Sequence, residues 1–402
     1  MELQVLFSGV PYTGTLPQGE AVLVTQDSRR ACPGAVFVCA RGMTTDGHDH
    51  ARKALEAGAV CIVTERPLGL PGEVQVASGR KAYAQLCQNF FGRPAEKLRL
   101  VAVTGTNGKT TVTTLIKQTL EQAGCKAGLI GTIHTEIDAM DVPAKYTTPE
   151  PWDLNALFSR MVLAGCTFAV MEASSQALDQ LRLWGLTFEV GVFTNLTQDH
   201  LDYHKTFENY FAAKKSLFSQ VKHMVVNLDD SYGRRLLDEV RFTVIRGNIS
   251  EVKTLASGAG TTKGVDADVA DRVTEENLDG AVAFAKAFAA KTGAVVAITG
   301  AIDIVADGAK AYCIRNGHPM MSAITGTGCQ LSALTAAFIT ANPGQPLEAA
   351  AAAVCAMGLA GEIAHARLTP LDGNATYRNY IIDAIYHMTP AQLEEGAKYE
   401  VR

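Results

Sequence analysis

The sequence has few of the features that mark a secreted or a nucleic-acid-binding protein. Its nine cysteines form no Cys-x-x-Cys pair and most lie in apolar stretches, which indicates buried reduced thiols rather than disulfides or a zinc site. The formal net charge is −5, with 36 basic and 41 acidic residues, so the chain lacks the excess of positive charge typical of nucleic-acid recognition. We therefore expect no nucleic-acid partner.

Long hydrophobic runs are also scarce. The first residues, Met1-Glu-Leu-Gln-Val-Leu-Phe7, lack the basic flank and apolar centre of a signal peptide, and no run approaches the roughly 18 apolar residues of a membrane span. We expect a cytoplasmic protein without a membrane partner. The 402 residues, 47% of them hydrophobic, suffice for two or three domains with sizeable cores.

The clearest motif is a phosphate-binding loop. Residues 98–104 form an apolar run typical of a buried strand, and residues 112–121 show a helical pattern. Glycines between them let backbone N–H groups turn toward one anion, Lys109 adds positive charge, and a threonine hydroxyl can bind Mg²⁺. The order of strand, motif and helix favours nucleotide binding over an ordinary glycine turn. The residues predicted to bind ATP are Gly105, Thr106, Asn107, Gly108, Lys109, Thr110 and Thr111.

A second candidate metal ligand ends another predicted strand. Phe168-Ala-Val-Met-Glu172 is apolar up to its last residue, and two serines follow shortly after it. The carboxyl ends of strands in α/β sheets bind ligands, and a carboxylate beside a phosphate loop commonly binds Mg²⁺. The alternative is a solvated acid at a strand end. We predict that Glu172 and Thr110 together hold Mg²⁺.

The first 95 residues predict a small α/β domain. Val22–Val24, Ala35–Cys39 and Ala59–Val63 are typical of short strands, and residues 50–57 of a helix. Polar clusters lie between these elements, and each alone is typical of a turn because Asp, Ser and Gly favour loops. The clusters are Asp27-Ser-Arg29, Pro33-Gly34 and Asp46-Gly-His48.

Taken with the phosphate loop, these clusters resemble the Mur ligases, which use ATP to add an amino acid to a UDP-N-acetylmuramoyl-peptide in peptidoglycan synthesis. The resemblance implies that residues 1–95 bind the UDP of UDP-N-acetylmuramoyl-dipeptide. It implies that residues 96–238 are a truncated central domain with a P-loop and a parallel sheet. In the family, the substrate carboxylate takes the γ-phosphoryl group of ATP, and an amine then displaces phosphate.

The resemblance also assigns roles to single residues. Composition alone favours a surface position for Lys214, but the family pattern Ala-Lys-x-x-Leu-Phe implies a carbamylated, catalytic lysine that binds Mg²⁺, alongside catalytic Lys109. Gln176 departs from the family, in which many members have histidine. Residues 195–204, rich in His and Asp, are expected to form a loop near the phosphates rather than a zinc site. The residues implied to contact the UDP-muramoyl-peptide are Ser28, Thr147, Thr148, Ser175 and Arg182.

A second glycine-rich turn lies near the end of the chain, at Ile324-Thr-Gly-Thr-Gly-Cys329. Cys329 begins a predicted helix, and a helix N-terminus lowers the pKa of a thiol there and attracts an anion. The alternative is a thiol that only packs.

Together with Val240–Glu251, Lys263-Gly-Val-Asp266 and Ala294–Gly308, this turn resembles hydroxyethylthiazole kinase, a thiamine-salvage family with the ribokinase-like fold. The resemblance covers residues 239–402 and implies the C-terminal half of such a kinase. It implies that Cys329 is the base that deprotonates the thiazole alcohol. The other implied contacts are Arg246 and Thr299 to ATP, Glu251 to Mg²⁺ and Gly326 to the thiazole.

The expected fold class is therefore α/β: a Mur ligase N-terminal domain and a truncated P-loop domain, joined to half of a ribokinase-like domain. The join falls on residues 236–240, which fit both families. Three hypotheses stay open: a fused ATP-dependent ligase and kinase, a chimera that binds nucleotide and UDP-sugar-peptide but completes neither reaction, and a reading frame without selected function. The kinase family forms trimers, so a homo-oligomer is one expectation.

Overall fold

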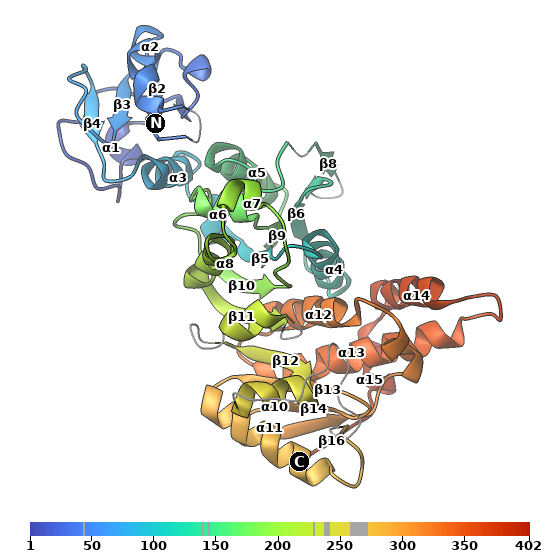
Figure 1. The fold of residues 1–402 in the computed structure, drawn as a ribbon. Helices are drawn as coiled ribbons and strands as arrows, with labels where there is room; N and C mark the ends of the chain where they lie inside the picture. Colours follow the sequence, from blue (N-terminus) through green and yellow to red (C-terminus); the bar gives the residue numbers. More distant parts are fainter. Residues whose placement is uncertain (43–44, 138–139, 144, 228–229, 237–241, 258–271) are drawn as a thin grey trace.

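The computed structural model describes residues 1–402 except 43–44, 138–139, 144, 228–229, 237–241 and 258–271 (Figure 1). Its strands form two sheets, both largely parallel, with helices packed against them, which confirms the α/β class. The N-terminal sheet lies at one end of an elongated molecule, and the C-terminal helices lie toward the other end.

The N-terminal unit contains a four-stranded parallel sheet in the order β1-β2-β3-β4. Its central strands are runs of apolar residues that are buried throughout, as expected for parallel strands covered on both faces. The elements are α1 (Leu3–Leu6), β1 (Leu23–Thr25), β2 (Ala35–Val38), α2 (Ala51–Glu56), β3 (Cys61–Thr64), β4 (Glu73–Gln75) and α3 (Gly79–Phe90).

The rest of the described chain forms one twelve-stranded sheet, in the order β16-β15-β14-β13-β12-β11-β10-β5-β9-β6-β7-β8. The strands from β13 to β6 in this order run parallel, and antiparallel strands extend the sheet at both ends. The strands are β5 (Arg99–Thr104), β6 (Ala127–Ile130), β7 (Thr135–Ile137), β8 (Met140–Val142), β9 (Phe168–Glu172), β10 (Phe188–Phe193), β11 (Val221–Asn227), β12 (Val244–Asn248), β13 (Val295–Thr299), β14 (Asp303–Ala306), β15 (Ala311–Ile314) and β16 (Tyr399–Val401).

Helices cover both faces of this sheet (Figure 1). They are α4 (Lys109–Gln122), α5 (Pro151–Leu163), α6 (Ser175–Asp179), α7 (Leu201–His204), α8 (Phe207–Lys215), α9 (Ser231–Leu236), α10 (Ile249–Ser257), α11 (Leu278–Thr292), α12 (Thr327–Ala341), α13 (Pro346–Ala366), α14 (Asn374–His387) and α15 (Pro390–Gly396).

The sheet is continuous across the join between the two family segments. Strand β11 precedes the join and β12 follows it, and the two pair in parallel with Asn227 opposite Arg246. Residues 237–241, where the join was expected, lie outside the described residues. The segments therefore share one sheet and are not separate bodies on an exposed tether.

Two hydrophobic cores cross the join as well. Side chains of successive strand residues point to opposite faces, so Val225 and Val244 pack on one face with α4, α12 and α13, and Val226 and Ile245 pack on the other. At the amino end of the sheet, the Arg99 guanidinium donates a hydrogen bond to the Thr340 carbonyl oxygen at the end of α12. Helices from the second segment thus complete the core of the first.

Two local expectations change. Residues near Glu251 were expected to form a polar turn, but α10 begins directly after β12. The reason is a capping box, because the Glu251 N–H donates to Asn248 Oδ1 at 2.9 Å and the Asn248 N–H donates to Glu251 Oε2 at 2.7 Å.

Helix α13 is long and apolar enough to cross a membrane, although no such run was expected; 78% of its apolar window is buried inside the protein.

Candidate functional site

The phosphate loop connects β5 to α4 in a conformation that requires glycine. Gly105 has φ +149°, and a Cβ at this position would lie 1.9 Å from Thr194 Oγ1. Gly108 has φ +84° and caps the N-terminus of α4. Backbone N–H groups and the positive end of the α4 dipole therefore meet at the carboxyl end of β5, which suits an anion.

Lys109 lies inside this loop. Its Nζ donates to the carbonyl oxygens of Gly105 at 3.0 Å and Thr106 at 2.8 Å. Burial lowers the pKa of Lys109, and the nearby carboxylates of Glu172 and Asp199 oppose that shift. The Lys109 ammonium group is partly removed from water, and its positive charge attracts phosphate oxygens.

Glu172 and Thr110, the predicted metal ligands, are in contact. Glu172 is buried at the end of β9, and its Oε1 accepts hydrogen bonds from the Thr110 hydroxyl at 2.9 Å and the Thr132 N–H at 2.8 Å. Glu172 Oε2 accepts from the Thr132 hydroxyl at 3.0 Å. A carboxylate and a hydroxyl beside a phosphate loop are the hard oxygen ligands that Mg²⁺ prefers, so these residues fit Mg²⁺.

Lys214 is buried, with 1% of its surface exposed, and is not the surface lysine that composition favours. Its Nζ donates to the Gly105 carbonyl oxygen at 2.7 Å and lies 4.7 Å from the centre of the Tyr210 ring. Burial, followed by the charge of Lys109, holds the pKa of Lys214 well below that of an exposed lysine. The neutral amine that carbamylation requires is therefore favoured here.

The residues expected to contact the muramoyl peptide lie along the neighbouring loops. The Thr148 hydroxyl donates to the Glu172 carbonyl oxygen at 2.8 Å, and the hydroxyl oxygens of Thr147 and Thr132 lie 3.0 Å apart within hydrogen-bond distance. The Arg182 guanidinium donates to the Thr148 carbonyl oxygen at 2.9 Å and pairs with Glu150 at 2.8 Å. Hydrogen bonds thus connect this side of the site to Glu172, the candidate metal ligand.

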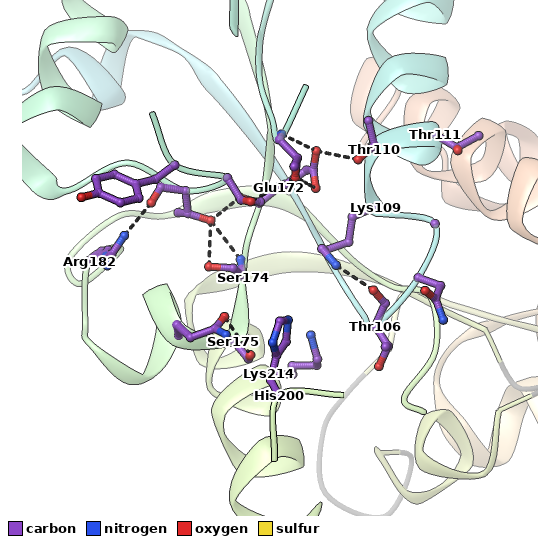
Figure 2. Close-up of a pocket in the computed structure, with 17 residues that line it drawn as sticks. Thr106, Lys109, Thr110, Thr111, Glu172, Ser174, Ser175, Arg182, His200 and Lys214 are labelled. Carbon is purple, nitrogen blue, oxygen red and sulfur yellow. Dashed lines mark hydrogen bonds between the residues drawn. The ribbon is translucent and has the colours of Figure 1, made fainter. Parts of the chain in front are cut away.

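These residues line one cavity of about 610 Å³. Figure 2 shows Lys109 and Thr110 on the phosphate-loop side of the cavity, with Ser175, His200 and Lys214 on the other elements around it. The structure thus brings together nearly all of the predicted ligase residues. The cavity is lined by Thr106, Asn107, Gly108, Lys109, Thr110, Thr111, Thr132, Tyr146, Thr147, Thr148, Glu172, Ser174, Ser175, Gln176, Arg182, His200 and Lys214.

Sequence reasoning missed the role of His204 in supporting this cavity. His204 is buried, and its Nε2 lies 2.9 Å from Ser175 Oγ. Burial lowers the pKa of His204, which favours the neutral imidazole. The His-x-x-x-His spacing of His200 and His204 was the available signal. In the described part of the chain no three His, Cys, Asp or Glu residues gather as a metal site.

A second cavity, of about 740 Å³, lies between the N-terminal unit and the central domain and includes Ser28. Its lining is rich in arginine and lysine, which suits a phosphate-containing ligand. Tyr146 lines both cavities, so the two adjoin at this side chain. The arginines and lysines of the second cavity are Arg29, Arg30, Arg41, Lys53, Arg80 and Lys145.

The expected kinase residues lie elsewhere, and neither of these two cavities includes them. Arg246 and Thr299 lie near the carboxyl ends of the adjacent strands β12 and β13. Glu251 lies in the capping box of α10. Gly326, with φ +100°, caps α12, and Cys329 lies half-buried in the first turn of that helix.

Comparison with known proteins identifies two families. The hydroxyethylthiazole kinase family model matches residues 216–391, and a hydroxyethylthiazole kinase from Clostridium acetobutylicum is 54% identical over 204 residues, which cover 48% of this chain and 74% of that kinase. The chain belongs to the hydroxyethylthiazole kinase family. It also carries Mur ligase domains, because the Mur ligase family catalytic domain model matches residues 21–90 and the Mur ligase middle domain model matches residues 103–269. The kinase and middle-domain matches overlap over residues 216–269, which include the paired strands β11 and β12.

Individual Mur ligases are similar over the first part of this kinase-family chain. UDP-N-acetylmuramoyl-L-alanyl-D-glutamate–2,6-diaminopimelate ligase 1 from Clostridium acetobutylicum is 44% identical over 257 residues, covering 63% of this chain and 53% of the ligase. The corresponding ligase from Clostridium perfringens is 40% identical over 255 residues, covering 62% and 53%. The chain spans about half the length of these Mur ligases. A solved structure of such a ligase shares the fold, with a TM-score of 0.53 and 24% identity over 82% of this chain and 61% of that one.

Proposed function

We propose that the chain is an ATP-dependent enzyme with a Mur-type ligase module and a hydroxyethylthiazole kinase module. The ligase module binds ATP, Mg²⁺ and UDP-N-acetylmuramoyl-dipeptide, and transfers the γ-phosphoryl group of ATP to the substrate carboxylate. One observation carries this proposal: the phosphate loop, the candidate metal ligands and four of the five expected muramoyl-peptide contacts line a single cavity.

In this reaction the phosphate loop binds the triphosphate. Lys109 exchanges its contacts to the carbonyl oxygens of Gly105 and Thr106 for contacts to the β- and γ-phosphates, while the α4 N-terminus faces the same oxygens. Thr110 and Glu172 hold Mg²⁺, which supplies positive charge against the charge that develops on the transferred group. Catalysis then rests on positioning and charge neutralisation.

Lys214 contributes a second carboxylate once it is carbamylated. Its neutral amine attacks the carbon of CO₂, a new N–C bond forms, and one proton leaves the nitrogen to solvent. The site favours this step because burial lowers the pKa of Lys214. The carbamate then lies beside Gly105 and the phosphate loop, where Lys214 Nζ lies now.

On the substrate side, Arg182, Thr148 and Ser175 orient the muramoyl peptide toward the phosphate loop. Arg182 is fixed by Glu150 and the Thr148 carbonyl oxygen, and Ser175 by His204. Ser28 in the adjoining cavity binds the UDP part, with the basic side chains around it. The amine that displaces phosphate then completes an amide bond.

The kinase module transfers phosphate from ATP to the alcohol of hydroxyethylthiazole. Its support is the 74% of the related kinase that the chain covers, together with the position of Cys329 at the α12 N-terminus. There Cys329 acts as base, Gly326 contacts the thiazole, Arg246 and Thr299 contact ATP, and Glu251 binds Mg²⁺.

ADP release tests both activities with the purified chain. One assay contains UDP-N-acetylmuramoyl-dipeptide with 2,6-diaminopimelate, and the other contains hydroxyethylthiazole. Release in the first assay that disappears in Lys109→Ala supports the ligase, and release in the second that disappears in Cys329→Ser supports the kinase. ADP binding by calorimetry without release in either assay would establish the binding chimera instead.

A further inference from the structure

A series of hydrogen bonds crosses the join between the two family segments. The Arg246 guanidinium on β12 donates to Asn227 Oδ1 on β11 at 2.5 Å, and Asn227 Nδ2 donates to the Thr194 carbonyl oxygen at 3.0 Å. The Thr194 hydroxyl then donates to the carbonyl oxygen of Asn107 at 2.7 Å. The series starts in the kinase segment and ends in the phosphate loop of the ligase segment.

The three members before the phosphate loop are buried. Arg246 is 3% exposed, Asn227 6% and Thr194 1%. A guanidinium can only donate, so it fixes Oδ1 of Asn227 toward itself and leaves Nδ2 of Asn227 to donate onward. Since the strand ends β12, β11 and β10 are adjacent in the sheet, this arrangement depends on the pairing of β11 with β12 across the join.

Thr194 meets the phosphate loop at two points. Its Oγ1 donates to the Asn107 carbonyl oxygen and occupies the space beside Gly105 in which a Cβ would lie. The neighbouring Asn195 completes the contact, because its Oδ1 accepts from the Asn107 N–H at 2.9 Å. The position of the β10 end therefore determines the conformation of the loop that would bind phosphate.

We propose that Arg246 is a positioning residue for the phosphate-loop nucleotide site: through Asn227 and Thr194 it holds the loop in its binding conformation. This inference rests on the nucleotide binding proposed above. It gives Arg246 a second role, in the ligase module, that neither family segment would have alone. The two modules are then coupled, because a change at the strand end of the kinase segment alters nucleotide affinity in the ligase segment.

The test measures by calorimetry the affinity of the phosphate-loop site for ADP, which is the ADP binding that Lys109→Ala removes from the whole chain. Wild type is compared with Arg246→Met, with Asn227→Asp and with the double variant. Asn227→Asp keeps an oxygen for Arg246 but removes the donor to Thr194, so it interrupts the series at its second link. We expect each single variant to bind ADP about tenfold more weakly, and the double variant no more weakly than either.

Arg315→Met is the matched control. Arg315 is also a kinase-segment arginine and pairs with Glu275 at 2.8 Å and Glu400 at 3.3 Å, away from the series. It should leave ADP affinity unchanged. If the wild-type chain does not bind ADP, the proposed function itself is wrong. If the wild-type chain binds ADP tightly and Asn227→Asp binds it equally well, only the proposed role of Arg246 is wrong. If Arg246→Met does not fold, Asn227→Asp alone decides the outcome.

Discussion

At the scale of single residues, the phosphate loop depends on one position that accepts no side chain. Gly105 combines φ +149° with the close approach of Thr194 Oγ1, so both its conformation and its surroundings exclude alanine. Gly124, just after α4, has φ +80°, but a Cβ there would meet no heavy atom of the described chain within 4 Å. Both glycines have a positive φ, but only Gly105 has an atom in the way of a Cβ. Alanine substitutions at the two positions therefore separate the effect of backbone strain from the effect of steric conflict.

We predict that Gly105→Ala destabilises the protein by about 3 kcal/mol or more and abolishes ADP binding, since the Thr194 side chain or the loop must move. Gly124→Ala should cost about 1 kcal/mol and leave ADP affinity unchanged. Urea denaturation and calorimetry measure the two effects. Equal ADP affinity in Gly105→Ala and wild type would contradict this account of the loop.

Lys214 gives stability a dependence on pH. The pKa of Lys214 in the folded state lies well below the ordinary value of 10.5. At a pH between the folded-state pKa and 10.5, the unfolded chain binds more protons than the folded chain, so the free energy of unfolding rises with pH. We predict that Lys214→Met has a higher Tm than wild type at pH 7 in CO₂-free buffer, and that this difference shrinks toward pH 10. The control Lys222→Met removes an exposed lysine that pairs with Glu189. Parallel profiles of Lys214→Met and wild type would argue against a depressed pKa.

The sequence could predict single residues where the signal lies within one short stretch of the chain. The spacing of Gly105, Gly108, Lys109 and Thr110 predicts a phosphate-binding loop, and the structure has the expected strand before it and helix after it. Lys214 could not be found this way, because its burial depends on the packing of α8 against the loop. The contacts of Thr147, Thr148, Ser175 and Arg182 with substrate came from resemblance alone and stay predictions.

At the scale of elements, the joining of two incomplete segments depends on helix α12. It belongs to the kinase segment, yet it packs against α4 and lies over the ligase strands β10 and β11. Leu334, 1% exposed, lies in this core. The strand pattern of each segment could be predicted from apolar runs, but the pairing of β11 with β12 could not, since register between segments of different families leaves no local signal.

We predict that Leu334→Ala destabilises the protein by about 2 to 5 kcal/mol and also lowers ADP affinity, because it leaves a cavity in the core that α12 shares with the phosphate-loop helix. Leu371→Ala, at a side chain that is 98% exposed, should change stability by less than about 0.5 kcal/mol. Chemical denaturation followed by circular dichroism provides the measurement. A change below about 1 kcal/mol in Leu334→Ala would show that α12 is not part of the common core.

At the scale of the whole molecule, the arrangement of hydrophobic cores predicts how the chain unfolds. The N-terminal unit has its own cores. Of the three described cores of the long sheet, two contain residues from both family segments and the third contains residues from the ligase segment alone. The central domain of the ligase segment and the kinase segment should therefore unfold together.

We predict two calorimetric transitions, of which the larger contains both the central domain and the kinase segment. ADP at about 100 times its Kd should stabilise this larger unit by about 2.7 kcal/mol and raise only its Tm. Hydrogen exchange would then show added protection in β12 and β13 as well as in the phosphate loop. Protection confined to residues before the join would indicate two independent bodies.

The ends of the long sheet have a consequence for how copies of this chain behave at high concentration. Among the residues that the structure describes, the strand at each edge, β8 or β16, has three residues, so each described edge presents few unpaired backbone groups. A short edge gives a strand from another molecule little to add to, which limits fibre growth by edge-to-edge pairing. The twelve-stranded sheet can thus remain part of a discrete molecule, because its two outermost strands are short although the sheet contains many strands.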